Sequence, residues 1–145
     1  MPHHVVILGG SYGGIAAMRR LSKYPEIQVT LIEQHPYHFL QTEGYELISS
    51  NTSFEETIVS LLALCANYDN VTFRHSTVAS IESPQKVILL SDGELPYDTL
   101  IIALGSVTKL FKYDDNVYNY SSGAKSLRGA LRLNGIILLC TFRHL

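Results

Sequence analysis

The chain has 145 residues, of which 46% are hydrophobic and 17% are charged, and this length suits one domain with a hydrophobic core better than two. Its 11 lysine and arginine residues against 13 acidic residues give a net charge of −2, with no basic stripe to neutralise phosphates, which disfavours a nucleic-acid partner. The low charge content and a mean hydropathy of +0.12 predict some apolar surface that another domain or chain covers.

The cysteines and the apolar runs exclude further classes of protein. Cys65 and Cys140 lie far apart and form neither a Cys-x-x-Cys pair nor a Cys/His ligand pattern, which predicts a reducing compartment and no metal site. Only four apolar residues precede Gly9, so no signal peptide is expected. The longest apolar run near the other end, Ile136–Cys140, is far shorter than the ~20 residues that span a bilayer, so no transmembrane segment is expected.

The first 33 residues predict a strand, a helix and a second strand. Val5–Leu8 is rich in β-branched residues, as strands buried in parallel sheets are. Residues 15–23 contain good helix formers and end before Pro25, and Ile27–Ile32 alternates as a strand does. Two strands joined through a helix by short loops predict the βαβ unit of a doubly wound α/β sheet.

The middle of the chain predicts one more helix and then several strands. Residues 35–53 have no clear period and are predicted to be irregular, with one short helical turn. Ser53, with Glu56 three residues later, predicts the start of a helix over residues 54–66. The remaining predictions are strands at 71–75, 77–81 and 86–90, a turn at 91–94, and a central, fully buried strand at 99–104.

The pattern weakens after Lys109. Residues 113–122 are polar and rich in tyrosine, which is typical of a loop at a subunit interface. Residues 124–133 predict a helix, whereas residues 134–145 fit either a helix or a strand. The apolar residues of this tail would be exposed if unpacked, so we expect the tail to dock on the sheet or on another chain, and a homodimer through the tail is a hypothesis.

A glycine cluster follows the first strand and opens the first helix. Gly9 and Gly14 take the first and last positions of the dinucleotide-binding fingerprint, and Ser11 replaces the middle glycine. Glu33 ends the second strand, where an acidic residue accepts hydrogen bonds from ribose hydroxyls and repels a 2′-phosphate. The pattern predicts FAD or NAD rather than NADP, with its pyrophosphate at the N-terminus of the helix; a tight turn with a solvated glutamate is the alternative.

Four segments together resemble one group of proteins. Residues 5–14 with Glu33 resemble an opening FAD-binding motif, and residues 36–41 are similar to a stretch that passes near the flavin. Residues 95–106 resemble the second FAD motif, with Leu104 in place of its usual threonine, and residues 124–133 resemble the segment that leads into an NADH domain. The chain thus resembles type II NADH dehydrogenases, flavoproteins of the pyridine nucleotide-disulfide oxidoreductase superfamily.

The resemblance implies a fold, a cofactor and a set of contacts. It implies a Rossmann-like FAD-binding domain of α/β class over residues 1–110, in which a parallel sheet with a βαβ start carries an antiparallel β-meander insert, and a linker with an apolar tail over residues 111–145. The implied activity is that of an FAD-dependent NAD(P)H oxidoreductase with a quinone acceptor. The candidate FAD-binding residues are Gly9, Gly10, Ser11, Tyr12, Gly13, Gly14, Glu33, Gln34, Gln41, Val78, Ala103, Leu104 and Gly105.

The resembled proteins continue with a second glycine fingerprint for NADH and a later Gly-Asp motif, and the 145 residues contain neither. The resemblance therefore implies the FAD-binding N-terminal part alone. NADH and quinone are expected partners only of a complete family member, and turnover by this chain alone is not expected. The expected location is the cytoplasm, with peripheral binding at the inner membrane face as an alternative.

Two other classes of function stay open. The first is an NAD-binding dehydrogenase or sensor domain, although the hairpin after the third strand argues against it. The second is a non-catalytic Rossmann-like module that assembles through a sheet edge and the apolar tail. Cys65 is expected to be a core residue, and His35 and His38 offer only a weak metal pattern because Pro36 between them forbids a regular helix.

Overall fold

The computed structural model describes residues 2–106 and 122–142, and the chain divides into two compact units. The first unit comprises Met1–His38 and Ser60–Gly105, and the second comprises Phe39–Val59 and Ser106–Leu145. Nearly all of the tyrosine-rich segment at 113–122 lies outside the described residues, so its predicted interface role stays a prediction.

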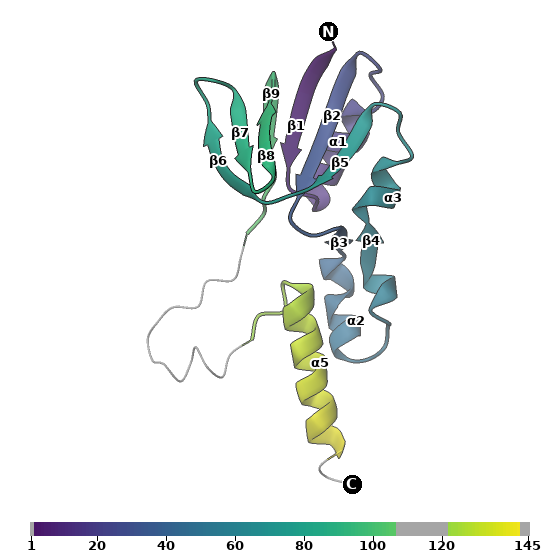
Figure 1. The fold of residues 1–145 in the computed structure, drawn as a ribbon. Coiled ribbons are helices and arrows are strands. Elements are labelled where there is room, and N and C mark those ends of the chain that lie inside the picture. Colours follow the sequence, from purple (N-terminus) through teal and green to yellow (C-terminus); the bar gives the residue numbers. More distant parts are fainter. Residues whose placement is uncertain (1, 107–121, 143–145) are drawn as a thin grey trace. The chain divides into compact units, whose positions relative to one another are not determined.

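A four-stranded parallel sheet forms the centre of the first unit (Figure 1). The helix α1 joins β1 to β2, and β1 pairs in parallel with both β2 and β9, which confirms the predicted βαβ start. The strand order is β5-β2-β1-β9. The elements are β1 (His3–Leu8), α1 (Tyr12–Leu21), β2 (Ile27–Glu33), β5 (Val71–His75) and β9 (Thr99–Ile102).

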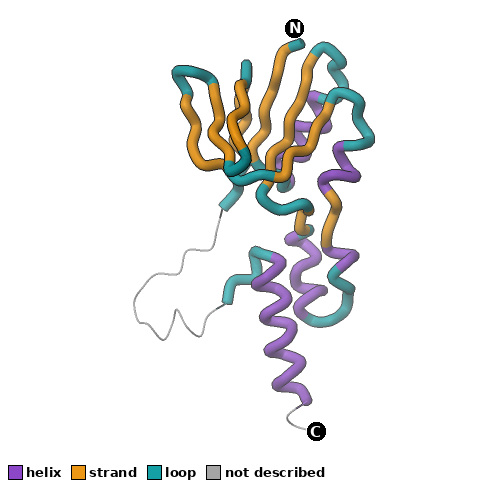
Figure 2. Tube along the Cα trace, in the orientation of Figure 1, coloured by secondary structure: helices purple, strands orange, loops and turns teal. Residues whose placement is uncertain are grey.

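Both faces of this sheet are covered, which explains the continuous apolar run of β1. Val5 and Ile7 pack with Met18 of α1 and Leu61 of α3, and Val6 and Leu8 pack on the other face against an antiparallel meander. Figure 2 shows the strands of the sheet and of the meander in orange and the helices in purple. Alternate residues of one strand therefore enter two different cores. The covering elements are α3 (Leu61–Cys65), β6 (Val78–Glu82), β7 (Val87–Leu90) and β8 (Gly93–Pro96).

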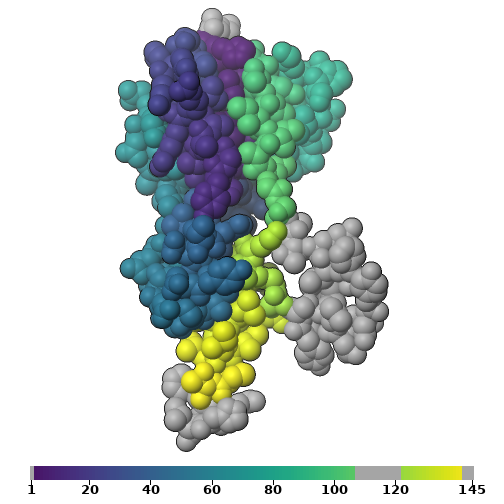
Figure 3. All heavy atoms as spheres, turned by 180° about the vertical axis from the view of Figure 1, so that it is seen from behind, coloured from purple at the N-terminus to yellow at the C-terminus, as the bar shows by residue number. Residues whose placement is uncertain are grey.

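The prediction that residues 99–104 form a central, fully buried strand is wrong. Strand β9 lies at one end of the sheet order, and within the described residues only β1 pairs with it. Ile102 is 62% exposed and Leu104 is 63% exposed. Figure 3 shows this segment in green at the surface, beside the purple residues of β1 and α1. An apolar run predicts burial on both faces, but it does not tell an edge strand from a central one.

The predicted single helix over residues 54–66 is also wrong. Glu56 accepts hydrogen bonds from the Ser53 backbone N–H at 2.9 Å and the Thr52 hydroxyl at 2.7 Å, as a capping residue would. The chain nevertheless becomes extended at Ile58, because β4 pairs with β3 and this pairing outweighs the local helical signal. The segment contains η2 (Glu55–Thr57), β4 (Ile58–Ser60) and α3, and β3 is Tyr37–Phe39.

The described residues of the second unit contain two α-helices, and the C-terminal tail forms the longer of them. The tail forms α5 (Leu127–Phe142), which packs against α2 (Gly44–Ile48), and η1 (Gln41–Glu43) precedes α2. The Asn134 side chain donates to the carbonyls of Leu47 at 3.1 Å and Ile48 at 3.2 Å, so it satisfies acceptors at the end of α2. Residues 134–142, whose sequence fits either a helix or a strand, are thus helical.

Several large apolar residues of α5 are exposed to solvent, and their exposed fractions range from 40% at Leu138 to 68% at Leu139. The predicted homodimer through this tail stays a prediction. Within residues 2–106 and 122–142, the structure contains no helix that is both long and apolar enough to cross a bilayer.

The two cysteines should differ strongly in reactivity. Cys65 lies in the core beneath the sheet, and its burial raises the pKa of the thiol to about 11, whereas Cys140 is exposed. We therefore expect one thiol per native chain to react rapidly with a chromogenic disulfide reagent at neutral pH. Cys140→Ser should abolish this rapid phase and Cys65→Ser should retain it. A rapid phase that persists in native Cys140→Ser would contradict the burial of Cys65.

Candidate functional site

The turn after β1 brings the two predicted FAD motifs together. Gly9 has a φ of +107°, and a Cβ at this position would lie 2.3 Å from the backbone oxygen of Ala103. The N–H of Ala103 donates to the carbonyl of Leu8 at 2.7 Å, so neither backbone segment can move away cheaply. The first motif therefore requires glycine here because the second motif lies directly beside it.

The start of α1 packs equally tightly on this turn. A Cβ at Gly14 would lie 1.8 Å from the carbonyl oxygen of Gly9, so the helix can approach the strand only with glycine at this position. Ser11, by contrast, has an extended backbone with φ −95°, which any residue tolerates. This explains why serine can stand at the middle fingerprint position.

The N-terminus of α1 has the features of an anion site. Its N-cap, Ser11, makes no side-chain capping hydrogen bond, and the first turn contains no acidic residue. Among residues 2–106 and 122–142, a Cβ at Gly13 would meet only the Cβ of Ala103, at 3.8 Å, so these residues leave space beside the helix end. Because the first N–H groups of a helix have no partner within it, this end suits a pyrophosphate. The residues present therefore fit the phosphates of a dinucleotide.

Glu33 closes the other side of the glycine loop. Its Oε2 accepts a hydrogen bond from the Gly10 N–H at 2.8 Å, and its Oε1 accepts from the N–H groups of Gln34 at 2.8 Å and His35 at 3.2 Å. An ionised carboxylate has about four lone-pair positions. One acceptor position is therefore left for a ribose hydroxyl, while the others hold the loop and the end of β2.

The residues around Glu33 come from the end of β2 and from the end of β5, which pairs with it. The N–H of Ser76 donates to the Glu33 carbonyl at 3.2 Å, and the His75 ring lies 3.0 Å from the Gln34 carbonyl through Nε2. Val78 lies two residues after Ser76, at the start of β6, and packs on the meander side of the sheet. Gln34 and Val78 thus lie on segments that adjoin Glu33. Gly105, which has a φ of +70°, ends the second motif.

A hydroxyl and carboxylate cluster that the sequence did not predict fixes the meander to this end of the sheet. The Ser76 hydroxyl donates to the Asp92 carboxylate, which also forms an ion pair with Arg74 at 3.1 Å. These hydrogen bonds and the Arg74 charge hold the pKa of Asp92 below its usual value, with the Ser76 hydroxyl as the largest cause. No spacing rule predicts the cluster, because its members come from β5 and the β7–β8 turn.

Sequence analysis also missed the role of His38. The His38 side chain is buried, and its ring meets the ring of Tyr12 edge to face, with centroids 4.6 Å apart. Burial lowers the pKa of His38, while the negative charge of Glu33 acts in the opposite direction. The His35 ring stacks on Tyr37 instead, so the two histidines have different surroundings. His38 therefore supports the glycine loop through Tyr12.

The lowered pKa of His38 makes the stability of the fold depend on pH. Below about pH 6.5 the unfolded chain binds a proton at this position that the folded chain takes up only at lower pH, so the free energy of unfolding should fall as the pH drops from 7 to 5. His38→Phe keeps a ring against Tyr12 and should flatten this part of the profile. Urea unfolding at several pH values measures it, and equal slopes in both proteins would contradict the assignment.

Gln41 belongs to the second unit. Its Nε2 donates to the Lys125 carbonyl at 3.0 Å, and it lines a cavity of about 350 Å³ together with Gly44, Tyr45 and Ala124. Tyr45 is 74% exposed beside it. The predicted flavin contact of Gln41 stays a prediction.

Comparison with known proteins places this geometry in a family. The family profile of pyridine nucleotide-disulphide oxidoreductases matches residues 3–134. The chain belongs to this family. Members of the family and its structural neighbours are flavin-dependent oxidoreductases.

Two relatives show the sequence similarity. The NADH dehydrogenase-like protein YutJ of Bacillus subtilis is 33% identical over 109 residues, which are 72% of this chain and 30% of that protein. A type II NADH:quinone oxidoreductase of Staphylococcus aureus is 27% identical over 110 residues, which are 74% of this chain and 27% of that protein. The chain thus spans about 30% or less of the length of these two relatives.

Solved structures of the family share the fold. The sulfide:quinone oxidoreductase of Aquifex aeolicus superposes with a TM-score of 0.85 at 28% identity, over 94% of this chain and 32% of that chain. NDH2 of Plasmodium falciparum, solved in complex with NADH, gives a TM-score of 0.82 at 24% identity, over 97% of this chain and 30% of that chain. The α/β fold with its antiparallel insert is thus the fold of these oxidoreductases, as the sequence predicted.

Proposed function

We propose that residues 1–110 form the first portion of the FAD-binding domain of an NADH dehydrogenase-like oxidoreductase, and that residues 111–145 form a linker and tail. One observation carries this proposal: the glycine loop lies against Ala103 on one side and against the Glu33 carboxylate on the other. The two motifs implied by the resemblance are thereby joined at one site.

In this proposal each part of the loop holds one part of the cofactor. The N–H groups at Gly13 and Gly14 and the hydroxyl of Ser11 bind the pyrophosphate, and the remaining acceptor position of Glu33 binds the adenosine ribose. Tyr12 borders the loop at the start of α1. The flanking contacts come from Gln34 and Val78 at the adenosine end, from Ala103, Leu104 and Gly105 along the second motif, and from Gln41.

The chemistry that FAD supplies when bound is two-electron transfer from a reduced nicotinamide to an acceptor. The relatives include an enzyme named as a type II NADH:quinone oxidoreductase, which supports NADH as the electron donor and a quinone as the acceptor of a complete protein. Such a protein works in the cytoplasm or at the inner membrane face, where a lipid-soluble quinone is within reach.

An absorption spectrum of the purified chain, taken after incubation with FAD and removal of free ligand, tests the proposal. We expect flavin bands to be retained with FAD and lost with riboflavin, because the site recognises the pyrophosphate and the ribose of the adenosine half. Riboflavin lacks both groups and is therefore the matched control.

Two results would replace the proposal with another function. Uptake of NAD without uptake of FAD, measured by calorimetry, would indicate an NAD-binding dehydrogenase or sensor domain. A folded chain that binds neither nucleotide and sediments as a dimer would indicate a non-catalytic module that assembles through its apolar surfaces.

A further inference from the structure

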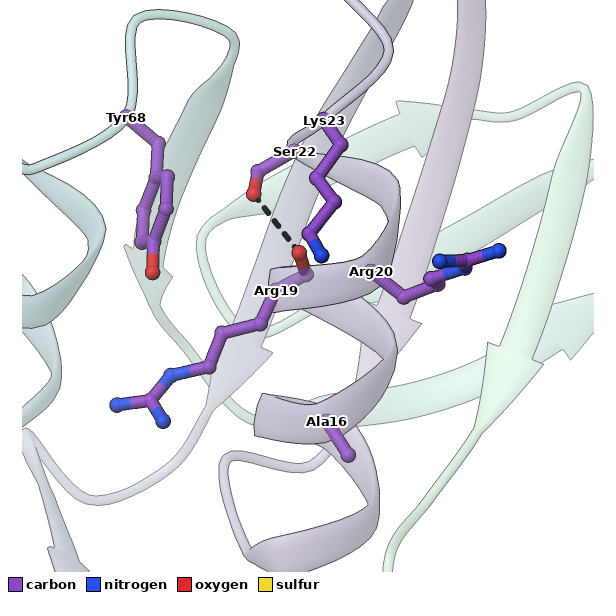
Figure 4. Close-up of a pocket in the computed structure, with 6 residues that line it drawn as sticks. All are labelled: Ala16, Arg19, Arg20, Ser22, Lys23 and Tyr68. Atoms are coloured by element: carbon purple, nitrogen blue, oxygen red, sulfur yellow. Dashed lines mark hydrogen bonds between the residues drawn. The ribbon is translucent and has the colours of Figure 1, made fainter.

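A second cleft lies at the opposite end of α1 from the glycine loop. It has a volume of about 430 Å³ and is lined by Ala16, Arg19, Arg20, Ser22, Lys23 and Tyr68 (Figure 4). Helix α1 has ten residues, so about 15 Å separates its two ends. All lining residues belong to the first unit, and none is a candidate FAD contact. The cleft is therefore separate from the dinucleotide site.

The cleft is strongly cationic in a chain whose net charge is −2. Arg19, Arg20 and Lys23 are three of its six lining residues, and no acidic residue lines it. The ion pairs of the described residues are His3–Asp98 and Arg74–Asp92, so none of the three cations forms an ion pair with a described acidic side chain. Their charge is available to a ligand.

The helix dipole explains only part of this arrangement. Cations in the last turn of a helix are favoured by the partial negative charge at its C-terminus, which accounts for Arg19 and Arg20. Lys23 lies beyond the helix C-cap, and Tyr68 comes from the segment after α3. The helix dipole therefore does not explain why the phenol ring and hydroxyl of Tyr68 line the cleft.

The directions of the two arginines differ. Figure 4 shows the Arg19 side chain extending on the side of the helix where Tyr68 lies, and the Arg20 side chain extending on the other side. The Ser22 hydroxyl donates to the Arg19 carbonyl at 3.1 Å, so its oxygen can still accept a hydrogen bond. Arg19, Lys23 and Tyr68 are thus the residues that can converge on one ligand.

We propose that this cleft binds a small phosphorylated molecule, with Arg19 and Lys23 contacting the phosphate and the Tyr68 hydroxyl donating a further hydrogen bond. The guanidinium fork of arginine matches the geometry of phosphate oxygens, and lysine adds a compact charge. The cleft volume of about 430 Å³ lies within the range of small-molecule sites.

Titration of the ¹⁵N-labelled full chain with pyrophosphate at low ionic strength tests this, with amide shifts in the NMR spectrum as the readout. We expect shifts at residues 19–23 and at Tyr68, and a separate set at residues 10–14 if the dinucleotide site also accepts the anion. The experiment therefore tests the cleft and the dinucleotide site independently. Potassium chloride at equal ionic strength is the control for general screening.

Two single substitutions form a matched pair. Arg19→Gln and Arg20→Gln remove the same charge from adjacent exposed positions of one helix, so both proteins should keep the melting temperature of the parent. We expect Arg19→Gln to weaken pyrophosphate binding at this cleft by about tenfold, and Arg20→Gln to weaken it by less than about threefold. Arg19→Gln combined with Lys23→Gln should abolish the shifts at residues 19–23 and leave those at residues 10–14 unchanged.

Three results would overturn the proposal. Equal weakening by Arg19→Gln and Arg20→Gln would show a response to net charge alone. Pyrophosphate shifts confined to residues 10–14 would show that the cleft binds no phosphate. Arg19-dependent sedimentation with vesicles that contain phosphatidic acid, without any response to free pyrophosphate, would assign the cleft to a lipid headgroup instead.

Discussion

Gly9→Val should strongly destabilise the first unit. Its backbone has a φ of +107°, which a β-branched residue rarely adopts, and its Cβ would lie 2.3 Å from the Ala103 backbone oxygen. Relief would require breaking the 2.7 Å hydrogen bond from the Ala103 N–H to the Leu8 carbonyl, where β1 and β9 end side by side. Strain and the lost hydrogen bond together should cost about 3–5 kcal/mol, a large part of the stability of a domain of this size.

Circular dichroism and urea unfolding measure this effect, and Gly13→Ala is its control. A Cβ at Gly13 would meet only the Cβ of Ala103, at an ordinary distance of 3.8 Å. Alanine in a helix is also more stable than glycine by about 1 kcal/mol, so Gly13→Ala should fold at least as well as the parent. Its methyl group occupies space at the helix end, so FAD binding should weaken although stability does not. A Gly9→Val protein with the stability of the parent would contradict the close approach.

The β1–α1–β2 unit and its glycine loop could be predicted because their signals are local. Val5–Leu8, the glycine cluster and the helix formers before Pro25 follow one another within a short stretch, and each local preference agrees with the tertiary fold. Gly14 is required by its contact with Gly9 in the same loop, whereas the contact that requires Gly9 comes from Ala103 in the second motif. Such positions are the ones that a fingerprint records.

The features that sequence analysis missed depend on contacts between distant segments. The capping signal at Ser53 is present, but pairing between β3 and β4 decides the conformation of residue 58. The position of β9 at the sheet edge depends on strand order, which an apolar run does not contain. The contact of His38 with Tyr12 joins residues that are 26 positions apart, and no periodicity relates them.

Glu33→Ala should weaken FAD binding by about 1–3 kcal/mol, or roughly 5- to 150-fold in the dissociation constant, if the proposed ribose contact is made. The substitution also leaves the Gly10 N–H without the acceptor that it has at 2.8 Å, so part of the loss would come from a less ordered glycine loop. Calorimetric titration with FAD measures the affinity, and urea unfolding measures the effect on the loop and its unit.

Glu33→Gln separates the two contributions. Its amide oxygen can still accept from the Gly10 N–H, so the glycine loop should stay close to that of the parent. Its NH2 group cannot accept from the Gln34 and His35 N–H groups, so the free energy of unfolding should fall between those of the parent and Glu33→Ala, and the charge that favours the ribose hydroxyls is lost. An FAD affinity between those of the parent and Glu33→Ala would assign the difference to the ribose. If Glu33→Ala and the parent bound FAD equally, the carboxylate would serve the loop and the end of β2 alone, because Gly10, Gln34 and His35 already donate three hydrogen bonds to it.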